Sequence, residues 1–136
     1  MNERAVLAAA QALSVVLATA SIVVGALYAG PEHFVRRPLP PGQETLVVLV
    51  ESAFPVWPFL FGVTGVIALV CALMRREVII GHGLVVASWA FWGLCLIIAP
   101  LRSVPPTPIL VGVIAIVLGV GANVCAAILW AALGVK

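Results

Sequence analysis

Four long apolar segments constrain this chain more than any other feature of its sequence. They run from Ala5 to Ala29, from Leu46 to Met74, from Val78 to Leu101 and from Ile109 to Val135. A helix needs about 20 residues to cross the hydrocarbon core of a bilayer, and each segment reaches that length. None of the segments shows the alternation of polar and apolar residues that marks the strands of a membrane barrel. The sequence therefore predicts an all-α fold, a single bundle of four transmembrane helices.

The composition excludes a soluble fold. Of the 136 residues, 64% are hydrophobic and 9% are charged. Soluble domains carry about 25% charged residues, so a bilayer is expected to cover the apolar surface of this chain. The net charge of +2 is small, and no basic run indicates a nucleic-acid partner. The expected surroundings are lipid, together with further copies of the chain or other membrane proteins.

Basic residues give a modest indication of orientation. Four helices place both termini and the turn "RRE" on one side of the membrane. That side holds four basic residues and the other side holds three, namely Arg4, Arg75, Arg76 and Lys136 against Arg36, Arg37 and Arg102. Because cytoplasmic loops favour Lys and Arg, we expect both termini to lie in the cytoplasm.

The second segment contains a carboxylate and two prolines in "ESAFPVWP". Proline is tolerated in the first turn of a helix, and residues 55–74 suffice for one crossing. We therefore expect a break near residues 53–58, with Glu51 at headgroup depth as an anchor and Trp57 in the aromatic belt. The alternative is a functional polar site inside the bundle, because ionisable groups in membrane segments often mark ion paths. Three arginines on the same side are its candidate partners: Arg36, Arg37 and Arg102.

The fourth segment carries a stripe of small residues at intervals of four, with an amide in the middle: Ala115, Gly119, Asn123, Ala127 and Ala131. Small side chains let membrane helices approach closely, and a buried amide can hydrogen-bond across the contact. We expect this stripe to pack against another helix. Its sequence does not distinguish a helix of the same chain from one of a neighbouring chain.

The third segment, "GHGLVVASWAFWGLCLI", places His82 near one end and two tryptophans near mid-depth. His82 and Trp89 are seven residues apart and share a face, so they form either part of a packed core or a polar lining. No metal site is expected, since His33 and His82 belong to opposite sides and the three cysteines are isolated. No nucleophile–base pair or phosphate loop is recognisable. The chain is therefore expected to be no enzyme and to bind no cofactor.

The stretch "ESAFPVWPFLFGVTGVIALV", followed by "RREVIIGHGLVVASWAFWGLCLI", resembles small four-helix membrane proteins of actinobacterial phages that are treated as holin-like. The resemblance covers about half of the chain and concerns its layout. A carboxylate with Pro and Trp opens the second helix, and a Gly-His pair and two tryptophans lie in the third. It implies self-association in the host inner membrane and a part in lysis.

Three classes of function remain open. The first is a self-associating membrane protein of the holin-like kind. The second is an accessory or structural subunit that packs against a larger membrane complex. The third is a small transporter or channel that uses Glu51, although the first helix carries no interior charge of the kind found in small multidrug exporters.

Overall fold

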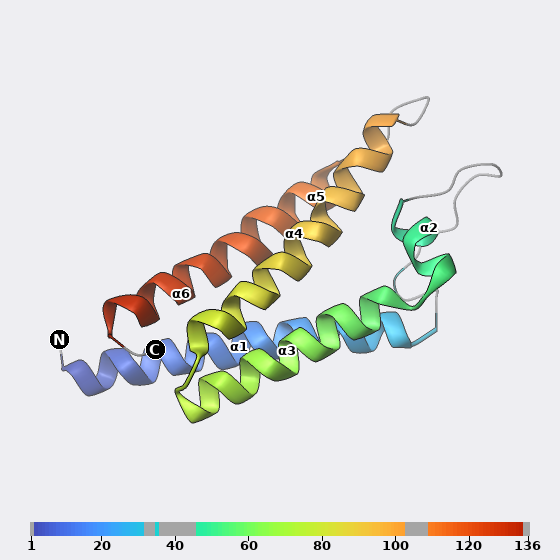
Figure 1. Ribbon diagram of the computed structural model, residues 1–136. Coiled ribbons are helices and arrows are strands. Elements are labelled where there is room, and N and C mark those ends of the chain that lie inside the picture. Colours follow the sequence, from blue (N-terminus) through green and yellow to red (C-terminus); the bar gives the residue numbers. More distant parts are fainter. Residues whose placement is uncertain (1, 32–34, 36–45, 103–108, 135–136) are drawn as a thin grey trace.

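The computed structural model describes residues 2–31, 35, 46–102 and 109–134, and most of these lie in helices (Figure 1). The elements are α1 (Glu3–Ala29), α2 (Leu46–Ala53), α3 (Val56–Met74), α4 (Val78–Arg102), α5 (Leu110–Ile114), the π-helix η2 (Ala115–Val120) and α6 (Gly121–Ala132). The last three follow one another without a gap and are called the last helix below. Four of the described helices are long and apolar enough to cross a membrane. The predicted all-α bundle of four such helices is confirmed.

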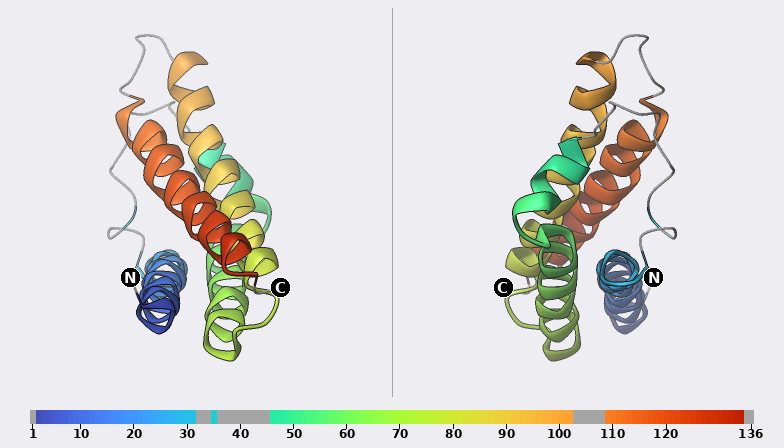
Figure 2. Two further views of the ribbon diagram at one scale, coloured as in Figure 1. Left: turned by 90° about the vertical axis from the view of Figure 1, so that its left-hand side faces the viewer. Right: turned by 90° about the vertical axis from the view of Figure 1, so that its right-hand side faces the viewer.

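The four long helices form two pairs. α1 packs along α3, α4 packs along the last helix, and α3 also packs against α4, which joins the pairs. Figure 1 shows the pairs close together at the end that carries the start of α1, the end of α6 and the α3–α4 turn. The pairs diverge toward the opposite end, where α2 lies. Figure 2 shows α1 at one edge of this arrangement.

Glycines close both pairs. A Cβ atom on Gly25 of α1 would lie 2.6 Å from the backbone nitrogen of Gly62 in α3. In the second pair, a Cβ atom on Gly112 would lie 2.9 Å from the carbonyl oxygen of Gly93. Lipid removes the hydrophobic drive between helices, so close van der Waals packing has to replace it. The backbones approach to a distance that a side chain at either glycine would prevent.

The short turn between α3 and α4 is tied to α1 by a glutamine. Arg75 ends α3 in the left-handed conformation, with φ 54° and ψ 37°. Gln11 of α1 donates from Nε2 to the carbonyl oxygen of Ala72 at 3.0 Å, and Arg75 donates from Nη2 to Gln11 Oε1 at 2.7 Å. Since the last carbonyl groups of a helix lack intrahelical partners, Gln11 both satisfies the end of α3 and fixes it to α1.

The second apolar segment is broken where its prolines lie. α2 ends at Ala53, and α3 begins at Val56 after Pro55. Trp57 lies inside the bundle and does not face lipid: its side chain is 0% exposed, and its Nε1 donates to the carbonyl oxygen of Val47 at 3.0 Å. The reason is that α2 folds back against α4 as well as α3, which covers the indole. The proline break therefore serves to turn α2 into the bundle.

We predict that Gly25→Ala destabilises the bundle and that Gly83→Ala does not. The new methyl group at position 25 would meet the α3 backbone at 2.6 Å, whereas a Cβ atom on Gly83 meets nothing within 4 Å. Forcing a methyl group into a packed contact costs about 1–3 kcal/mol. Thermal unfolding of both variants in detergent, followed by circular dichroism, measures the difference. Equal melting temperatures for the two variants would show that the α1–α3 contact is looser than described.

Candidate functional site

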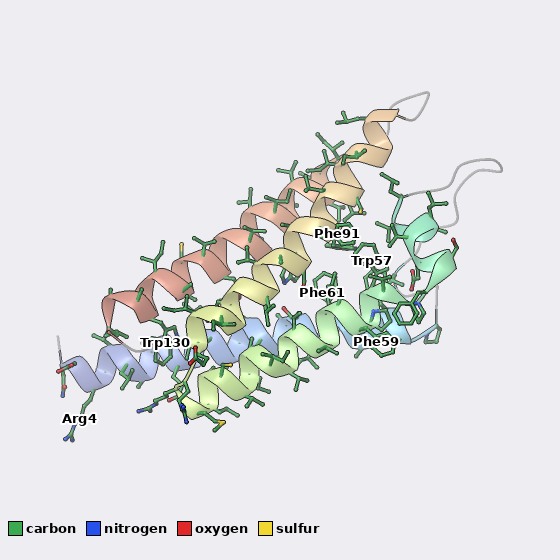
Figure 3. All side chains as sticks on the ribbon, viewed as in Figure 1. Arg4, Trp57, Phe59, Phe61, Phe91 and Trp130 are labelled. Carbon is green, nitrogen blue, oxygen red and sulfur yellow. The ribbon has the colours of Figure 1, made fainter. Side chains whose placement is uncertain are left out.

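A buried polar cluster joins α1, α4 and α6, with His82 at its centre. Its members are Ser14, His82, Asn123 and Trp130, and we call it the His82 cluster. The His82 side chain is 2% exposed. Its Nε2 lies 2.9 Å from Ser14 Oγ, and its Nδ1 lies 2.8 Å from Asn123 Oδ1. Trp130, labelled in Figure 3 where α6 approaches α1, donates from Nε1 to Ser14 Oγ at 2.8 Å.

Two polar side chains of the cluster also have a partner on their own helix. Ser14 Oγ lies 3.0 Å from the carbonyl oxygen of Ala10, and Asn123 Nδ2 donates to the carbonyl oxygen of Gly119 at 2.7 Å. A polar group without a partner costs several kcal/mol in hydrocarbon. The hydrogen bonds of the cluster therefore hold α1, α4 and α6 in the observed arrangement, because separating the helices would leave these polar side chains without partners.

The cluster is one step of a regular series along α1. Ser14, Ser21 and Tyr28 are seven residues apart and lie on the side of α1 that faces α4. Trp89 Nε1 donates to Ser21 Oγ at 3.1 Å, and Trp92 Nε1 donates to the hydroxyl of Tyr28 at 2.8 Å. Three α1 hydroxyl groups thus meet three ring nitrogens of α4. The spacing of seven was visible in the sequence, but it has meaning only once the two helices are known to face each other.

Aromatic rings surround the two hydrogen bonds that Trp89 and Trp92 donate to α1. Trp89 and Trp92 lie edge to face with ring centroids 5.6 Å apart, and Phe61 of α3 lies edge to face with Trp89 at 5.1 Å. Phe61 and Trp57 are both labelled in Figure 3, where they point into the space between α3 and α4. The tryptophans are thus part of an aromatic core with satisfied N–H groups, so the packed-core interpretation describes them better than a polar lining does.

The stripe on the last helix differs in part from the prediction. Ala115, Gly119 and Asn123 are buried as expected, but Ala127 is only half-buried and Ala131 is exposed. The residues that actually continue the buried face are Ala126 and Trp130. The reason is helical periodicity: a spacing of four drifts around an α-helix of 3.6 residues per turn. α1 shows the same pattern: Ala10, Ser14 and Ala18 are buried at intervals of four, and the next buried residue is Ser21.

Gly119 sits where the π-helix meets α4. A Cβ atom on Gly119 would lie 2.4 Å from Cδ2 of the Trp89 ring. Single π-turns inside α-helices are rare and frequently occur at functional sites. Here the widened turn and the missing side chain together let the Trp89 indole lie directly on the backbone of the last helix. Gly119 also supplies the carbonyl oxygen that orients Asn123.

The order Ser14–His82–Asn123 matches the hydrogen-bond order of nucleophile, base and orienting group in hydrolases. Its surroundings differ from those of an active site. Ser14 is 1% exposed, and its oxygen already lies within hydrogen-bond distance of Trp130, His82 and Ala10. A substrate carbonyl would reach Ser14 only if α6 separated from α1. In the observed state the three residues fasten helices.

The candidates around Glu51 lie apart from this cluster. Glu51 is half-buried on α2, at the end of the bundle where the helix pairs diverge. Arg36 and Arg37 lie outside the described residues, and only the backbone of Arg102, the last residue of α4, is described. Pairing of Glu51 with these arginines thus stays a prediction. Among the residues that the structure describes, no group of three or more His, Cys, Asp or Glu side chains is placed to hold a metal ion.

Comparison with known proteins adds no relative: no protein-family model, curated protein or solved structure matches this chain.

We predict that Gly119→Ile breaks the contact between α4 and the last helix, while Gly121→Ile leaves it intact. A side chain at position 119 would overlap the Trp89 ring, whereas a Cβ atom on Gly121 meets nothing within 4 Å. The free energy of unfolding should fall by about 3 kcal/mol or more, because the new side chain displaces both the Trp89 ring and the Gly119 carbonyl oxygen that accepts from Asn123. Thermal unfolding and the near-ultraviolet circular dichroism of the tryptophans measure it. If both variants unfold like the parent, Trp89 does not rest on Gly119.

We also predict that Asn123→Leu destabilises the bundle by more than the loss of a single hydrogen bond would. The change leaves the buried Nδ1 of His82 facing a hydrocarbon side chain, which costs about 1–3 kcal/mol for an unsatisfied group. Ser88→Ala is the matched control: Ser88 is equally buried and bonds Thr64 Oγ1 at 3.1 Å, but Thr64 keeps its bond to the carbonyl oxygen of Leu60. Equal losses of stability in the two variants would contradict the special position of Asn123.

Proposed function

We propose that this protein acts by self-association in a bacterial inner membrane and belongs to the holin-like kind, whose assembly raises the permeability of the membrane. The observation that carries the proposal is the outer face of α1. That face has the residue pattern of a helix–helix contact, although no helix of the described chain covers it.

The outer face of α1 contains a stripe of exposed residues spaced alternately by four and three, and Leu13 and Leu27 are also exposed beside it. The stripe consists of Ala5, Ala9, Ala12, Val16, Thr19, Val23 and Ala26. We call this set the α1 seam. A seven-residue repeat of this kind keeps one stripe turned toward a partner helix along its whole length. The seam lies on the side of α1 opposite its buried residues, which include Ser14 and Ser21.

The seam differs in composition from the other outward faces. Five of its seven residues are alanine or threonine, and the two others are valine. The exposed faces of α3 and of the last helix carry large side chains instead, among them Phe59, Leu73, Leu110 and Ile128. Membrane helix contacts are enriched in small residues because these let backbones approach, whereas lipid contact makes no such demand. The contrast favours α1 as the helix that contacts another protein.

A second copy of this chain is the partner that the seam fits best. Copies inserted in the same orientation can meet in parallel about a two-fold axis along the membrane normal, so that each seam residue faces its own counterpart. The hydroxyl of Thr19 lies near the middle of such a contact, where it can donate to the backbone of the opposite helix. α1 is also at the edge of the bundle, so that two copies can meet without rearrangement (Figure 2).

Two further features support the holin-like assignment. The layout of the second and third helices resembles that of holin-like phage proteins, as described above. Exposed Arg75 and Arg76 lie in the α3–α4 turn. Their charge favours a cytoplasmic position for that end of the bundle, where α1 begins and α6 ends. An accessory subunit of a larger complex would use the same seam against a different chain, so the experiments below separate the two.

We predict that cysteines placed in the α1 seam form disulfide-linked dimers. In a background without the native cysteines, Ala12→Cys and Thr19→Cys each place a thiol opposite its counterpart in a parallel pair. Val66→Cys, on the exposed face of α3, is the control. Oxidation in membranes followed by electrophoresis should give a dimer for both seam variants and little for the control. A dimer yield no higher than that of the control would contradict self-association through α1 and leave the accessory subunit.

The holin-like role predicts a permeability effect that depends on the same seam. Induced expression should depolarise a bacterial membrane, and Ala12→Leu should delay depolarisation at equal protein level, because a larger side chain separates the paired helices. Val117→Leu, on the exposed face of the last helix, should leave the timing unchanged. A potential-sensitive dye follows both. Seam dimers without depolarisation would contradict the holin-like role while leaving the self-association intact.

A further inference from the structure

We propose that His82 is a proton-binding site: its imidazole holds a second proton, on Nε2, while the bundle stays folded. The geometry lets the His82 cluster satisfy every hydrogen-bond donor both before and after the proton binds. This inference is independent of the proposed function, since it concerns the interior of a single chain.

The hydrogen-bond partners of Asn123 fix the orientation of its side-chain amide. Its Nδ2 lies 2.7 Å from the carbonyl oxygen of Gly119 and its Oδ1 lies 2.8 Å from His82 Nδ1. Rotating the amide by 180° would bring two oxygen atoms to 2.7 Å, which is repulsive because both only accept hydrogen bonds. The oxygen of Asn123 therefore faces the imidazole, and Nδ1 has to carry a hydrogen.

The neutral imidazole then has one possible tautomer. With its hydrogen on Nδ1, Nε2 is an acceptor, and the O–H of Ser14 is the donor beside it at 2.9 Å. In this state the Ser14 hydroxyl points at His82, while its oxygen accepts the N–H of Trp130. The carbonyl oxygen of Ala10 gives up its bond to Ser14 but loses nothing else, because an acceptor tolerates a missing bond better than a donor does.

The charged imidazole is accommodated by rotation of one hydroxyl group. A proton on Nε2 turns that nitrogen into a donor, and the O–H of Ser14 turns to the carbonyl oxygen of Ala10 at 3.0 Å. The Ser14 oxygen has two lone pairs, one for Trp130 and one for the new N–H of His82. Both ring nitrogens, the indole and the hydroxyl then donate to oxygen atoms, so no heavy atom of the cluster has to move.

Among the residues that the structure describes, no charged side chain is recorded as a partner of the His82 ring. Ionisable side chains on the elements packed around His82 are Glu3, Arg4 and Tyr28 of α1, Cys71 of α3, Cys95 and Arg102 of α4, and Cys125 of α6. In the part of the chain that the structure describes, the partners recorded for the imidazole are the Ser14 hydroxyl and the Asn123 amide. The added charge is thus stabilised by dipoles alone, and the ligand is the proton itself.

The proton comes from the aqueous phase at the end of the bundle with the α3–α4 turn. His82 lies one turn after Val78, the first residue of α4. The three residues just before Val78 are exposed and charged, namely Arg75, Arg76 and Glu77. The step is a simple transfer: hydronium gives its proton to the Nε2 lone pair and leaves as water. Because the ring is 2% exposed, brief separation of α1 from α4 at this end is needed for the exchange.

Nitrogen-15 NMR of histidine-labelled protein in lipid vesicles tests the proposal. His33→Gln removes the other histidine of the chain, so every signal belongs to His82. At neutral pH we expect the tautomer with hydrogen on Nδ1, and on acidification a form with both nitrogens protonated while the Trp130 indole signal stays in place. A neutral tautomer with hydrogen on Nε2 would overturn the proposal. Loss of the folded signals before the second proton binds would overturn it as well.

Ser14 variants test the mechanism of accommodation. Ser14→Ala removes the acceptor for the new N–H, so the doubly protonated form should disappear over the pH range in which the bundle is folded. Ser14→Thr retains a hydroxyl group and should restore that form, and Ser88→Ala, a buried serine outside the cluster, should not affect it. Protonation of His82 in Ser14→Ala at the same pH as in the parent would contradict the role of Ser14. If Ser14→Ala does not fold, the tautomer of the parent still decides.

Discussion

Hydrocarbon offers no partner to a polar group, and the rest of this structure depends on that constraint. Each polar side chain buried in the bundle has to find its partner on a neighbouring helix or on its own backbone. Ser14, Ser21 and Tyr28 do so by meeting three ring nitrogens of α4. These bonds fix the register between helices that apolar packing alone would leave free to slide. The His82 cluster extends the same register to α6.

Glycine contacts set how closely the helices approach, and the polar bonds set where along their length they do so. Gly25 brings α1 against α3, and Gly119 brings the last helix against Trp89. The two kinds of contact are linked at Gly119. Its missing side chain admits the indole, while its carbonyl oxygen orients Asn123 toward His82. One residue of the π-helix therefore contributes to both the packing and the hydrogen-bond geometry of the bundle.

The helices could be predicted from the sequence because the bilayer demands long apolar segments whatever their packing. The break at Pro55 could also be predicted, since proline acts through the local backbone. The burial of Trp57 and the exposure of Ala131 could not. The first depends on α2 folding back against α4, and the second on which side of the last helix its neighbours cover. His82 was recognised as a candidate, but its partner Ser14 lies 68 positions away in the chain, and Trp130, which donates to Ser14, lies 116 positions from it.

Because the two helix pairs diverge, a small rotation of one pair relative to the other moves their separated ends by a larger distance than their joined ends. Hydrogen bonds join the pairs from the His82 cluster as far as Trp92 and Tyr28, and the pairs separate toward α2 (Figure 1). About 15 Å of α4 lies beyond Trp92, at 1.5 Å per residue. A rotation of about 5° at Trp92 would therefore move the far end of α4 by about 1.3 Å over that helix length. α2 occupies the position where such a rotation is largest, so rearrangements too small to break the polar bonds can still change how tightly α2 and the buried Trp57 are gripped.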